Sequence, residues 1–283
     1  MEPSATPAGK ETGLDLVGIV LAAGAGTRLA PLSGLAPKAL CPVGNRALVD
    51  LALDRLEGLT STMAVNAHHF ADMVMRHIDQ EWGDAVTVSV ESGEALGTAG
   101  GIARLRGWID GRAAVVVNAD TWSPTSLAPL LDGWDGQTVR VMVNGGGGGF
   151  GPRARIVAST LPWSVTKNLV EHPTGLYEVV WRDTFARGEL EVVDHYGAFI
   201  DCGTPLDYLE ANLAAVGLNG SAIVGSGVTI EQGRDISGSV IGAGAHVSGD
   251  VVDSVVWPGQ SVGSDERLIR SIRAGTSVTV GPL

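Results

Sequence analysis

The sequence predicts an α/β protein: a Rossmann-like, mostly parallel sheet with flanking helices, followed by a short C-terminal left-handed parallel β-helix. Two patterns lead to this fold class. Short, almost continuous apolar runs at residues 16–21 and 113–117 end in Gly- or Asp-containing loops, as strands buried on both faces of a parallel sheet do. After about residue 218, aliphatic residues instead recur at six-residue intervals, and that period is typical of a parallel β-helix.

Strands and helices alternate along the first part of the chain, which favours a largely parallel sheet. Apolar residues at helical spacing predict the helices, and short β-branched runs predict the strands. Ligands of such sheets bind at the carboxyl ends of the strands, so the residues that follow those ends are the candidates for chemistry. The expected elements are a strand at 16–21, a helix at 47–59, a strand at 63–66, a helix at 70–82, and strands at 86–90 and 113–117.

The C-terminal repeat is imperfect, because its phase slips after Ile236 and again after Val247. An antiparallel Gly/Val-rich sheet is the alternative to a β-helix here. The predicted division of the chain is a flexible tail at residues 1–14, an α/β domain at 15–217 and a hexapeptide-repeat domain at 218–283. The aliphatic positions of the repeat are Val224, Ile230, Ile236, Ile241, Val247, Val256 and Val262.

Composition excludes several classes of function. The 283 residues include 19 Lys and Arg against 31 Asp and Glu, a formal charge of −12, and such a surface repels the backbone of nucleic acids. No apolar run approaches the roughly 20 residues that span a bilayer, and the N-terminus lacks the pattern of a signal peptide. Cys41 and Cys202 predict neither a disulfide framework nor a metal cluster. We therefore expect a cytoplasmic protein with no nucleic-acid or membrane partner.

The clearest pattern of chemical interest follows the first predicted strand. That strand opens into a loop with Gly24 and Gly26, where the absence of side chains lets backbone N–H groups approach phosphate oxygens. Arg28 and Lys38 add two cations to a chain that is otherwise acidic. No Gly-Lys-Ser/Thr follows, so this is not a Walker A loop, and Leu29 stands in place of the third glycine of a dinucleotide-binding loop. A turn with two surface cations is the alternative.

Residues 19–50 closely resemble the opening pattern of the sugar-1-phosphate nucleotidylyltransferases. That pattern is an apolar strand, Ala-Gly-x-Gly-Thr-Arg-Leu, Pro-Leu, Pro-Lys and an aliphatic-Pro pair, matched here by Pro42-Val43. Three further segments resemble the family in its own order. They are Glu91 to Gly101 for its second nucleotide-binding loop, Asn118-Ala119-Asp120 for a metal-binding Asp, and Phe199 to Pro205, with Tyr208 and Asn212 beyond, for its closing motif.

Each of these three segments also has a structural alternative. Gly97 to Gly101 suits a helix N-terminus with a Thr cap, Asp120 suits an N-cap or a turn, and Thr204 suits a helix cap.

The resemblance implies in-line attack of a sugar-1-phosphate oxygen on the α-phosphorus of an NTP, with release of pyrophosphate. It assigns Arg28 to the triphosphate and Lys38 to the charge at the α-phosphate, and it makes Asp120 and Asp201 the ligands of a Mg²⁺ cofactor. The nucleotide-binding residues that it implies are Leu21, Ala22, Ala23, Gly24, Gly26, Thr27, Glu91, Gly97 and Thr98.

The second loop is closest in pattern to mannose-1-phosphate guanylyltransferases, which favours GTP with mannose-1-phosphate and leaves uridylyl and thymidylyl transfer open. Hexapeptide β-helices mediate assembly in this family, so the resemblance also predicts a homo-oligomer.

One part of the family's pattern is missing. Its members carry a Glu-Lys-Pro segment whose Lys grips the sugar phosphate, and the similar string here is Glu171-His172-Pro173, later in the chain than expected. Arg153 or Arg155 is a candidate substitute, because Arg binds phosphate well. The alternative is a non-catalytic, nucleotide-binding regulatory homologue that assembles through its β-helix. The glycine run at residues 145–149 is either a lid over a pocket or solvated filler.

Four further residues have both a chemical and a structural interpretation. His68 and His69 follow a predicted strand, where a helix-start or surface role competes with a place in a pocket. His246 lies in the repeat region, where some β-helix acyltransferases use a catalytic His, but a lone His on so short a helix favours a structural role. Trp122 is the tryptophan best placed to contact substrate, with packing as the alternative.

Overall fold

The structure, a computed structural model, describes residues 14–145 and 149–280. The chain forms two compact units, one from Met1–Ala25 with Val49–Phe199 and the other from Gly26–Leu48 with Ile200–Leu283. Most of the predicted N-terminal tail and part of the glycine run at 145–149 lie outside the described residues. The predicted domain boundary after residue 217 stays a prediction.

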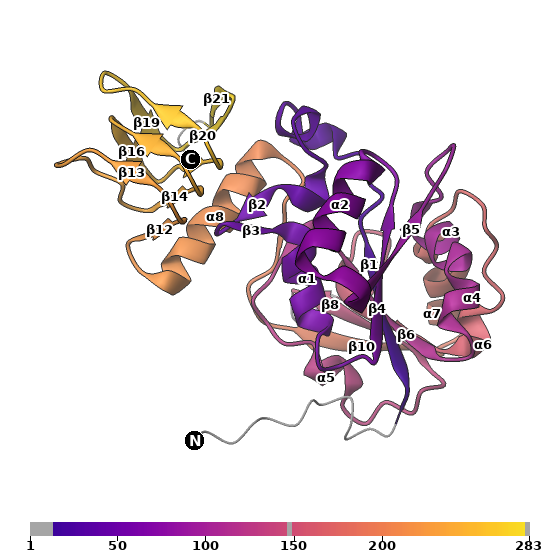
Figure 1. Ribbon diagram of the computed structural model, residues 1–283. Helices are drawn as coiled ribbons and strands as arrows, with labels where there is room; N and C mark the ends of the chain where they lie inside the picture. The colour runs from indigo at the N-terminus through magenta and orange to yellow at the C-terminus, as the bar shows by residue number, and fades with distance from the viewer. Residues whose placement is uncertain (1–13, 146–148, 281–283) are drawn as a thin grey trace, which may run out of the picture. The chain divides into compact units, whose positions relative to one another are not determined.

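The first unit is built on a seven-stranded sheet with the strand order β10-β8-β9-β6-β1-β4-β5 (Figure 1). Its described strands pair in parallel, except that β9 is antiparallel to β6 and β8. The predicted α/β class with a mostly parallel sheet is therefore confirmed. The strands are β1 (Leu16–Leu21), β4 (Thr62–Ala67), β5 (Val86–Val90), β6 (Ala113–Asn118), β8 (Val139–Asn144), β9 (Arg155–Leu161) and β10 (Leu190–His195).

Helices lie on both sides of this sheet (Figure 1). Gly18 in β1 allows α1 to approach closely, because a Cβ there would lie 3.0 Å from Leu56 Cδ1. On the other face, Val17 and Ile19 join Ile102 of α3 in a large buried apolar cluster. The α-helices are α1 (Leu48–Leu56), α2 (Ala71–Glu81), α3 (Gly97–Arg104), α4 (Arg106–Ile109), α5 (Ala128–Leu131), α6 (Trp163–Thr166) and α7 (Arg182–Ala186). The unit also contains the helical segments η5 (Gly83–Ala85) and η6 (Tyr177–Trp181) and the short strand β7 (Thr121–Trp122).

The second unit begins with η2 (Thr27–Leu29), η3 (Leu32–Gly34), η4 (Lys38–Leu40) and the hairpin of β2 (Pro42–Val43) and β3 (Arg46–Ala47). It continues with β11 (Ile200–Asp201) and α8 (Pro205–Asn219). Thr204 caps α8, because its side chain accepts the Asp207 N–H at 3.2 Å, and Pro205 occupies the first turn. The interpretation of Thr204 as a helix cap is thus confirmed.

Tyr208 is the buried anchor of α8. Its hydroxyl donates to the Pro42 carbonyl and accepts the indole N–H of Trp257 at 2.9 Å. One turn later, Asn212 accepts the Gly44 N–H at 3.0 Å. Burial raises the pKa of Tyr208 well above its usual range, so the phenol stays neutral and able to donate. The helix is thereby fastened to both the β2–β3 hairpin and the C-terminal strands.

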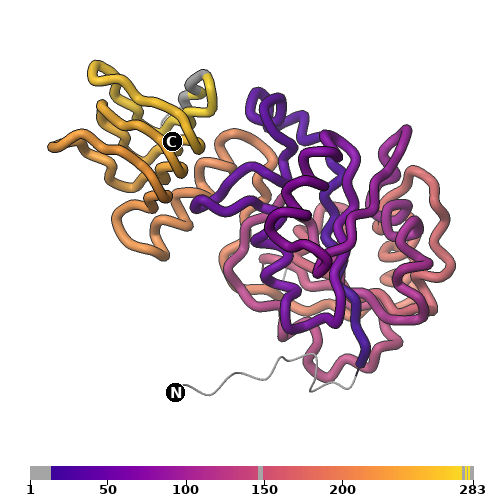
Figure 2. Tube along the Cα trace, viewed as in Figure 1, coloured from indigo at the N-terminus to yellow at the C-terminus, as the bar shows by residue number. Residues whose placement is uncertain are grey.

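After α8, the chain winds through successive turns (Figure 2). Its short strands pair in parallel to form three sheets, in the orders β12-β14-β17-β20, β13-β15-β18 and β16-β19. The antiparallel alternative is wrong for all of these pairs; β20 and β21 do pair antiparallel. Ile241, Val247, Val256 and Val262 are buried in one cluster as the repeat predicts, whereas Val224 is 46% exposed. The strands are β12 (Ala222–Val224), β13 (Thr229–Ile230), β14 (Ser239–Ile241), β15 (His246–Val247), β16 (Asp250–Val252), β17 (Val255–Val256), β18 (Ser261–Val262), β19 (Arg267–Ile269), β20 (Ser271–Ala274) and β21 (Thr276–Thr279).

Both cysteines are free and buried, as their small apolar character predicts, and burial raises the pKa of Cys41 to about 12. Within the described part of the chain, no helix combines the length and the apolar character that crossing a membrane requires.

A buried polar contact in the first unit joins α1 to α2. His77 Nε2 lies 2.9 and 3.0 Å from the two carboxylate oxygens of Asp50, and Trp82 Nε1 donates to the same carboxylate at 2.8 Å. The hydrogen bond to Asp50 raises the pKa of His77, against the opposing effect of burial. The imidazole of His77 therefore holds its proton more tightly in the folded protein than in the unfolded chain.

This contact predicts a pH-dependent contribution to stability. Because the pKa of His77 is higher in the folded than in the unfolded chain, its stabilisation is complete below the unfolded pKa of about 6.5 and is lost as pH rises through the folded value. His77→Gln should lower the free energy of unfolding by about 1.5–3 kcal/mol at pH 5.5, and by less at pH 8.5. Urea denaturation of both proteins across this range measures the difference; a constant difference would contradict the prediction. Comparing the two proteins cancels the opposite effect of His195, whose pKa is lowered by burial.

Candidate functional site

In the first unit, the strands that precede the candidate residues end at a common edge. Leu21 at the end of β1 is paired with Asn66 of β4 on one side and with Asn118 of β6 on the other. The Ala119 N–H donates to the Leu21 carbonyl at 2.9 Å, which fixes the turn that carries Asp120. The chain therefore leaves the sheet beside the Asp120 turn, through Leu21, Ala22, Ala23 and Gly24. This arrangement agrees with the expectation that the candidate residues gather at the carboxyl ends of the strands.

A chain of hydrogen bonds connects the loops at this edge. The Ala22 N–H donates to Asn66 Oδ1, Asn66 Nδ2 donates to Glu91 Oε1, and the Leu96 N–H donates to Glu91 Oε2, each at 2.7 Å. Asn66 is 1% exposed and Glu91 3% exposed. The sequence interpretation placed Glu91 at the nucleotide and missed Asn66. A polar residue that ends an apolar strand is the signal that points to Asn66.

The second loop is a true loop only up to Leu96, since α3 begins at Gly97. Gly97 has a φ of +67°, and a Cβ there would lie 2.6 Å from the Thr174 carbonyl oxygen, so this position requires glycine. Thr98 does not cap the helix: its hydroxyl accepts the Leu176 N–H at 2.7 Å, and α3 has no side-chain cap. The Thr-cap alternative is therefore wrong, and the contact of Gly97 and Thr98 with nucleotide stays a prediction.

Asp120 lies in the turn between β6 and β7 and is partly exposed. Trp122, two residues later, is buried at 5% exposure, which favours packing. His68 Nδ1 lies 3.1 Å from the Glu91 carbonyl oxygen, so its ring is bound to the start of the second loop.

The second unit brings three of the predicted residues together. Lys38 Nζ lies 3.3 Å from Asp201 Oδ1, and Arg28 Nη2 lies 3.9 Å from Asp201 Oδ2. The Lys38 side chain is buried, the Asp201 side chain is half exposed, and the Arg28 side chain is 73% exposed. A fixed lysine and an open arginine thus flank one carboxylate, and the open guanidinium is the group able to meet a phosphate.

Gly26 is required where the chain passes this cluster. Its φ is +62°, and a Cβ would lie 3.0 Å from the Cβ of Lys38. Gly203 is similarly tight, with a virtual Cβ 3.1 Å from Arg28 Nη2. Thr27 is the first residue of η2, which carries Arg28. Both glycines are thus explained by the packing of the two cations.

The carboxylates of Asp120 and Asp201 suit a hard cation, since Mg²⁺ prefers oxygen ligands. Among residues 14–145 and 149–280, no group of three or more His, Cys, Asp or Glu side chains could hold a metal ion. A protein contribution of two carboxylates, with phosphate oxygens and waters completing the octahedron, is the usual way of binding Mg²⁺. The residues present therefore fit Mg²⁺.

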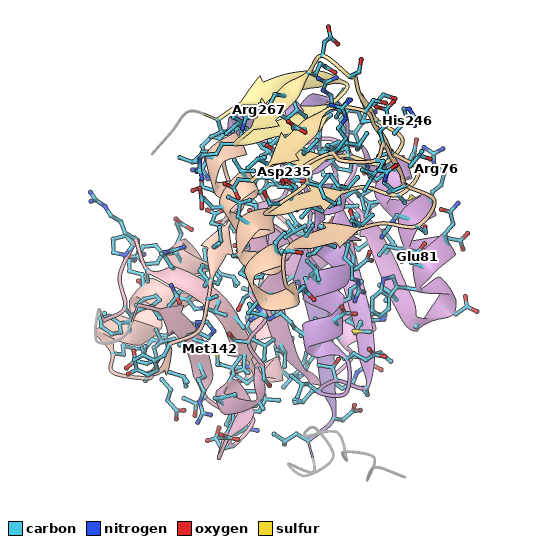
Figure 3. All side chains as sticks on the ribbon, turned by 90° about the vertical axis from the view of Figure 1, so that its left-hand side faces the viewer. Arg76, Glu81, Met142, Asp235, His246 and Arg267 are labelled. Atoms are coloured by element: carbon cyan, nitrogen blue, oxygen red, sulfur yellow. The ribbon has the colours of Figure 1, made fainter. Side chains whose placement is uncertain are left out.

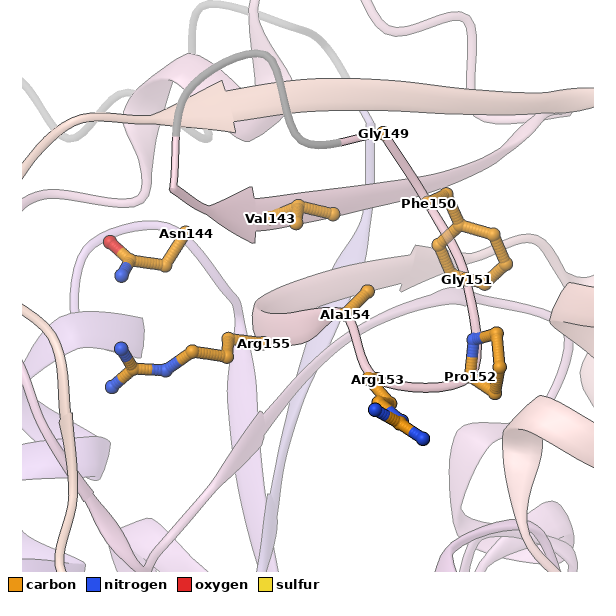
Figure 4. A pocket seen from close by; sticks show the side chains of 9 residues that line it. All are labelled: Val143, Asn144, Gly149, Phe150, Gly151, Pro152, Arg153, Ala154 and Arg155. Atoms are coloured by element: carbon orange, nitrogen blue, oxygen red, sulfur yellow. The ribbon is translucent and has the colours of Figure 1, made fainter.

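A separate pocket of about 400 Å³ lies in the first unit, between the ends of β8 and β9 (Figure 4). Phe150 fixes its rim by packing on Phe185 and Tyr177, with ring centroids 5.1 and 6.0 Å away. The lining residues are Val143, Asn144, Gly149, Phe150, Gly151, Pro152, Arg153, Ala154 and Arg155.

The two arginines of this pocket differ in their freedom. Arg155 donates to the Phe199 carbonyl at 2.9 Å and stacks on the Phe199 ring at 5.2 Å. Arg153 is exposed, and its guanidinium makes no hydrogen bond or ion pair with any residue that the structure describes. Asn144 is held by His195 Nδ1 at 3.0 Å. Arg153 is therefore the guanidinium of this pocket that is available to an anion, and Arg155 lies between it and Asn144 in the view of Figure 4.

The similar string Glu171-His172-Pro173 has a packing role. Glu171 pairs with Arg104 of α3 at 2.6 Å, and a Cβ at Gly100 would lie 2.4 Å from the His172 carbonyl oxygen. This segment supports α3 and supplies no lysine. His246, in the C-terminal strands of Figure 3, lies 3.2 Å from Ser248 Oγ in a surface network.

Residues 17–143 match the model of the nucleotidyl transferase family. The N-acetylmuramate α-1-phosphate uridylyltransferase of Caulobacter vibrioides is 38% identical over 134 residues, which cover 44% of this chain and 55% of that protein. The mannose-1-phosphate guanylyltransferase of Mycobacterium tuberculosis is 26% identical over 274 residues, covering 81% of this chain and 76% of that protein.

The fold is similar to that of a Bacillus anthracis protein described as a glucose-1-phosphate thymidylyltransferase. The TM-score is 0.60 at 20% identity, over 71% of this chain and 95% of that one. The match to the first relative spans little more than half of that protein's length. The glycine loop after β1 (residues 22–26, named the phosphate loop for its proposed role), the second loop and Asp120 all lie inside the matched segment. Residues 17–143 are thus similar to the nucleotidyl transferase family, and the two relatives, which are sugar-1-phosphate nucleotidylyltransferases by name, share this similarity.

Proposed function

We propose that this protein transfers a nucleotidyl group from an NTP to a sugar-1-phosphate, giving an NDP-sugar and pyrophosphate. The observation that carries the proposal is the cluster of Arg28 and Lys38 around Asp201, which follows a glycine loop in the domain that matches nucleotidyl transferases. The sugar-phosphate oxygen forms a bond to the α-phosphorus as the bond to the β-phosphate oxygen breaks. The protein forms no covalent intermediate, so it contributes positioning and charge neutralisation.

The chain's own cations have distinct parts in this reaction. Arg28, which is open to solvent, binds the triphosphate and then the leaving pyrophosphate. Lys38 is held at a fixed position by burial and by Asp201, so its charge is already oriented toward the α-phosphate before the substrate arrives. The backbone of residues 21–27 binds phosphate and ribose, and residues 91–98 form the side of the site nearest the base.

Asp120 and Asp201 are proposed as the ligands of Mg²⁺. The bound ion offsets the negative charge that develops on the phosphates. The carboxylate of Asp201 then has a second task, because it also fixes Lys38 at 3.3 Å.

The pocket between β8 and β9 is the proposed site of the sugar phosphate. Arg153 replaces the lysine that the family's Glu-Lys-Pro segment supplies, and Asn144 provides a polar contact held in place by His195. Arg155 shapes the wall through its contacts with Phe199.

GTP with mannose-1-phosphate is the proposed substrate pair, and two observations support it. The second loop has the Glu-x-x-Glu-x-Leu-Gly-Thr-Ala-Gly pattern, and the guanylyltransferase of M. tuberculosis matches over most of the chain. The higher identity of the C. vibrioides uridylyltransferase keeps UTP as the competing nucleotide.

We also propose that the C-terminal region is a left-handed parallel β-helix. Three observations support it: three sheets of short parallel strands, a shared apolar interior, and a repeated stacking of glycines. At both Gly225 and Gly242, an added Cβ would lie within 2.5 Å of a backbone atom of the next coil, so neither position has room for a side chain. The two glycines therefore occupy equivalent places. Assembly of copies through this region stays a prediction.

Pyrophosphate release across a grid of NTPs and sugar-1-phosphates, with and without Mg²⁺, tests the proposed function. We expect turnover on the order of 1 s⁻¹ or faster in the cell that holds GTP and mannose-1-phosphate, and only with Mg²⁺. Release in a UTP cell would change the base and leave the reaction class intact. Silence in every cell, from protein that still binds an NTP, would contradict the proposed activity and favour the regulatory alternative.

The metal assignment is tested by Asp120→Asn and Asp201→Asn. Each should lower kcat/KM by about 10²-fold or more and raise the Mg²⁺ concentration for half-maximal rate, because each removes one anionic ligand. Asp110→Asn is the matched control, since Asp110 ends α4 with a φ of +46° that Asn also tolerates. Wild-type Mg²⁺ dependence in either site variant would remove that residue from the metal site.

The sugar-phosphate assignment is tested by Arg153→Ala. Loss of a charge-assisted hydrogen bond should raise KM for the sugar-1-phosphate by about 10- to 100-fold and leave KM for the NTP nearly unchanged. Arg187→Ala is the control, because Arg187 forms an exposed pair with Glu189 in the same unit. An unchanged KM for the sugar-1-phosphate would exclude Arg153 as the replacement for the missing lysine.

A further inference from the structure

The connection between the two loops of the first unit depends on a pair of buried side chains. We define the Asn66–Glu91 relay as the path from the Ala22 N–H through the Asn66 amide and the Glu91 carboxylate to the Leu96 N–H, in which each step measures 2.7 Å. Ala22 is the first residue after β1, and Leu96 immediately precedes α3. The relay thus spans the start of the phosphate loop and the end of the second loop.

The donors and acceptors of the relay have one consistent order. The Ala22 N–H requires an acceptor, so the Asn66 amide must present its oxygen to Ala22, and its nitrogen then donates to the carboxylate of Glu91. Reversing the amide would set donor against donor at Ala22 and oxygen against oxygen at Glu91. Because Ala22, Asn66 and Glu91 are buried, an unmatched pair among them is costly.

The helix α3 packs so closely on the relay that no side chain larger than that of glycine fits between them at position 101. A Cβ at Gly101 of α3 would lie 2.6 Å from Asn66 Nδ2 and 2.8 Å from Glu91 Oε1. Both Glu91 oxygens are engaged, one by Asn66 and one by the Leu96 N–H. The carboxylate therefore faces the protein and α3 packs directly over it.

We propose that Asn66 and Glu91 are positioning residues: they set the separation of the phosphate loop and the second loop, and Glu91 acts on the nucleotide through these loops. This inference rests on the proposed nucleotidyl transfer. It gives Glu91 a part different from the direct nucleotide contact that the family resemblance implies, and it adds Asn66 to the machinery.

The polarity of the relay can be exchanged without changing its shape, and this provides the test. Asn66→Asp alone sets two carboxylates against each other, and Glu91→Gln alone leaves two donors facing at one of its ends. In the double variant, the aspartate accepts from the Ala22 N–H and from the glutamine amide, while the glutamine oxygen accepts from the Leu96 N–H. All three hydrogen bonds are then restored, and only the middle one is reversed: the side chain at position 91 donates and the side chain at position 66 accepts.

We expect each single variant to raise KM for the NTP by about tenfold or more with a smaller change in kcat, since misplacing a binding loop weakens ground-state binding. The double variant should return KM to within about threefold of wild type. If Glu91 contacts the nucleotide directly, the double variant keeps the defect of Glu91→Gln, and that result would overturn the proposal. Wild-type KM in both single variants would overturn it too.

Stability alone is separated from positioning by measuring KM well below the melting temperature of each variant. If the single variants do not fold, the KM of the double variant decides. Gly101→Ala supplies an independent perturbation, because it presses a methyl group on the relay without changing its chemistry; it should also raise KM for the NTP. Gly107→Ala, in the neighbouring α4 with open space around it, is the matched control and should behave as wild type.

Failure of the proposed function is distinguishable from failure of this inference. A wild-type protein that releases no pyrophosphate in any cell of the grid refutes the activity. In that case, calorimetric titration of the same variants with GTP still tests the relay, with the expected tenfold change in affinity and its rescue. An active wild type with no rescue refutes the relay and leaves the activity in place.

Discussion

The arrangement of the first unit depends on the common level at which neighbouring strands end. Where a parallel strand stops, its next backbone groups lose their partners in the sheet and must find others. The Ala22 N–H finds Asn66, the Glu91 N–H finds the Ala67 carbonyl at 2.8 Å, and the Ala119 N–H finds the Leu21 carbonyl. Because these partners lie on adjacent strands, three loops that are far apart in sequence are fixed to one edge. The chemistry of the domain follows from this edge rather than from any single motif.

The second unit solves a different electrostatic problem. The chain carries a formal charge of −12, whereas the substrates that we propose carry phosphates. Burial beside Asp201 fixes the position of the positive charge of Lys38. The free energy lost by removing this charge from water is offset by the Asp201 carboxylate, which is itself half exposed. Arg28 remains exposed beside the same carboxylate. Two cations of an acidic protein thus lie beside one carboxylate, and one of them is open to solvent.

The sequence predicts elements well where the pattern is local. The strand at 16–21 has the predicted bounds, since burial of a central strand demands an unbroken apolar run. The strand at 86–90 also has the predicted bounds, although it lies at the edge of the sheet, because its β-branched residues favour an extended chain. Asn66 escapes such reasoning because its partners, Ala22 and Glu91, are 44 and 25 residues away. Val224 fits the six-residue period but is exposed, because β12 is the first strand of its sheet and has a neighbour on one side. The local sequence likewise does not distinguish Arg153 from Arg155. Arg155 is fixed by Phe199, which is far away in the sequence, whereas Arg153 is not.

The glycines of α3 show why a motif match alone does not separate binding from packing. Each glycine in a helix costs about 1 kcal/mol relative to alanine, so a helix that starts Gly-Thr-Ala-Gly-Gly is weak by itself. Here Gly97 and Gly100 allow the backbone of Thr174 and His172 to approach, and Gly101 covers the Asn66–Glu91 relay. The stability of the helix thus depends on packing on both of its sides, so the conformation of the second loop depends on the surrounding structure. A string that resembles a nucleotide-binding loop can therefore owe its glycines to packing: at Gly97, Gly100 and Gly101 the space that a side chain would take is filled by other parts of the protein.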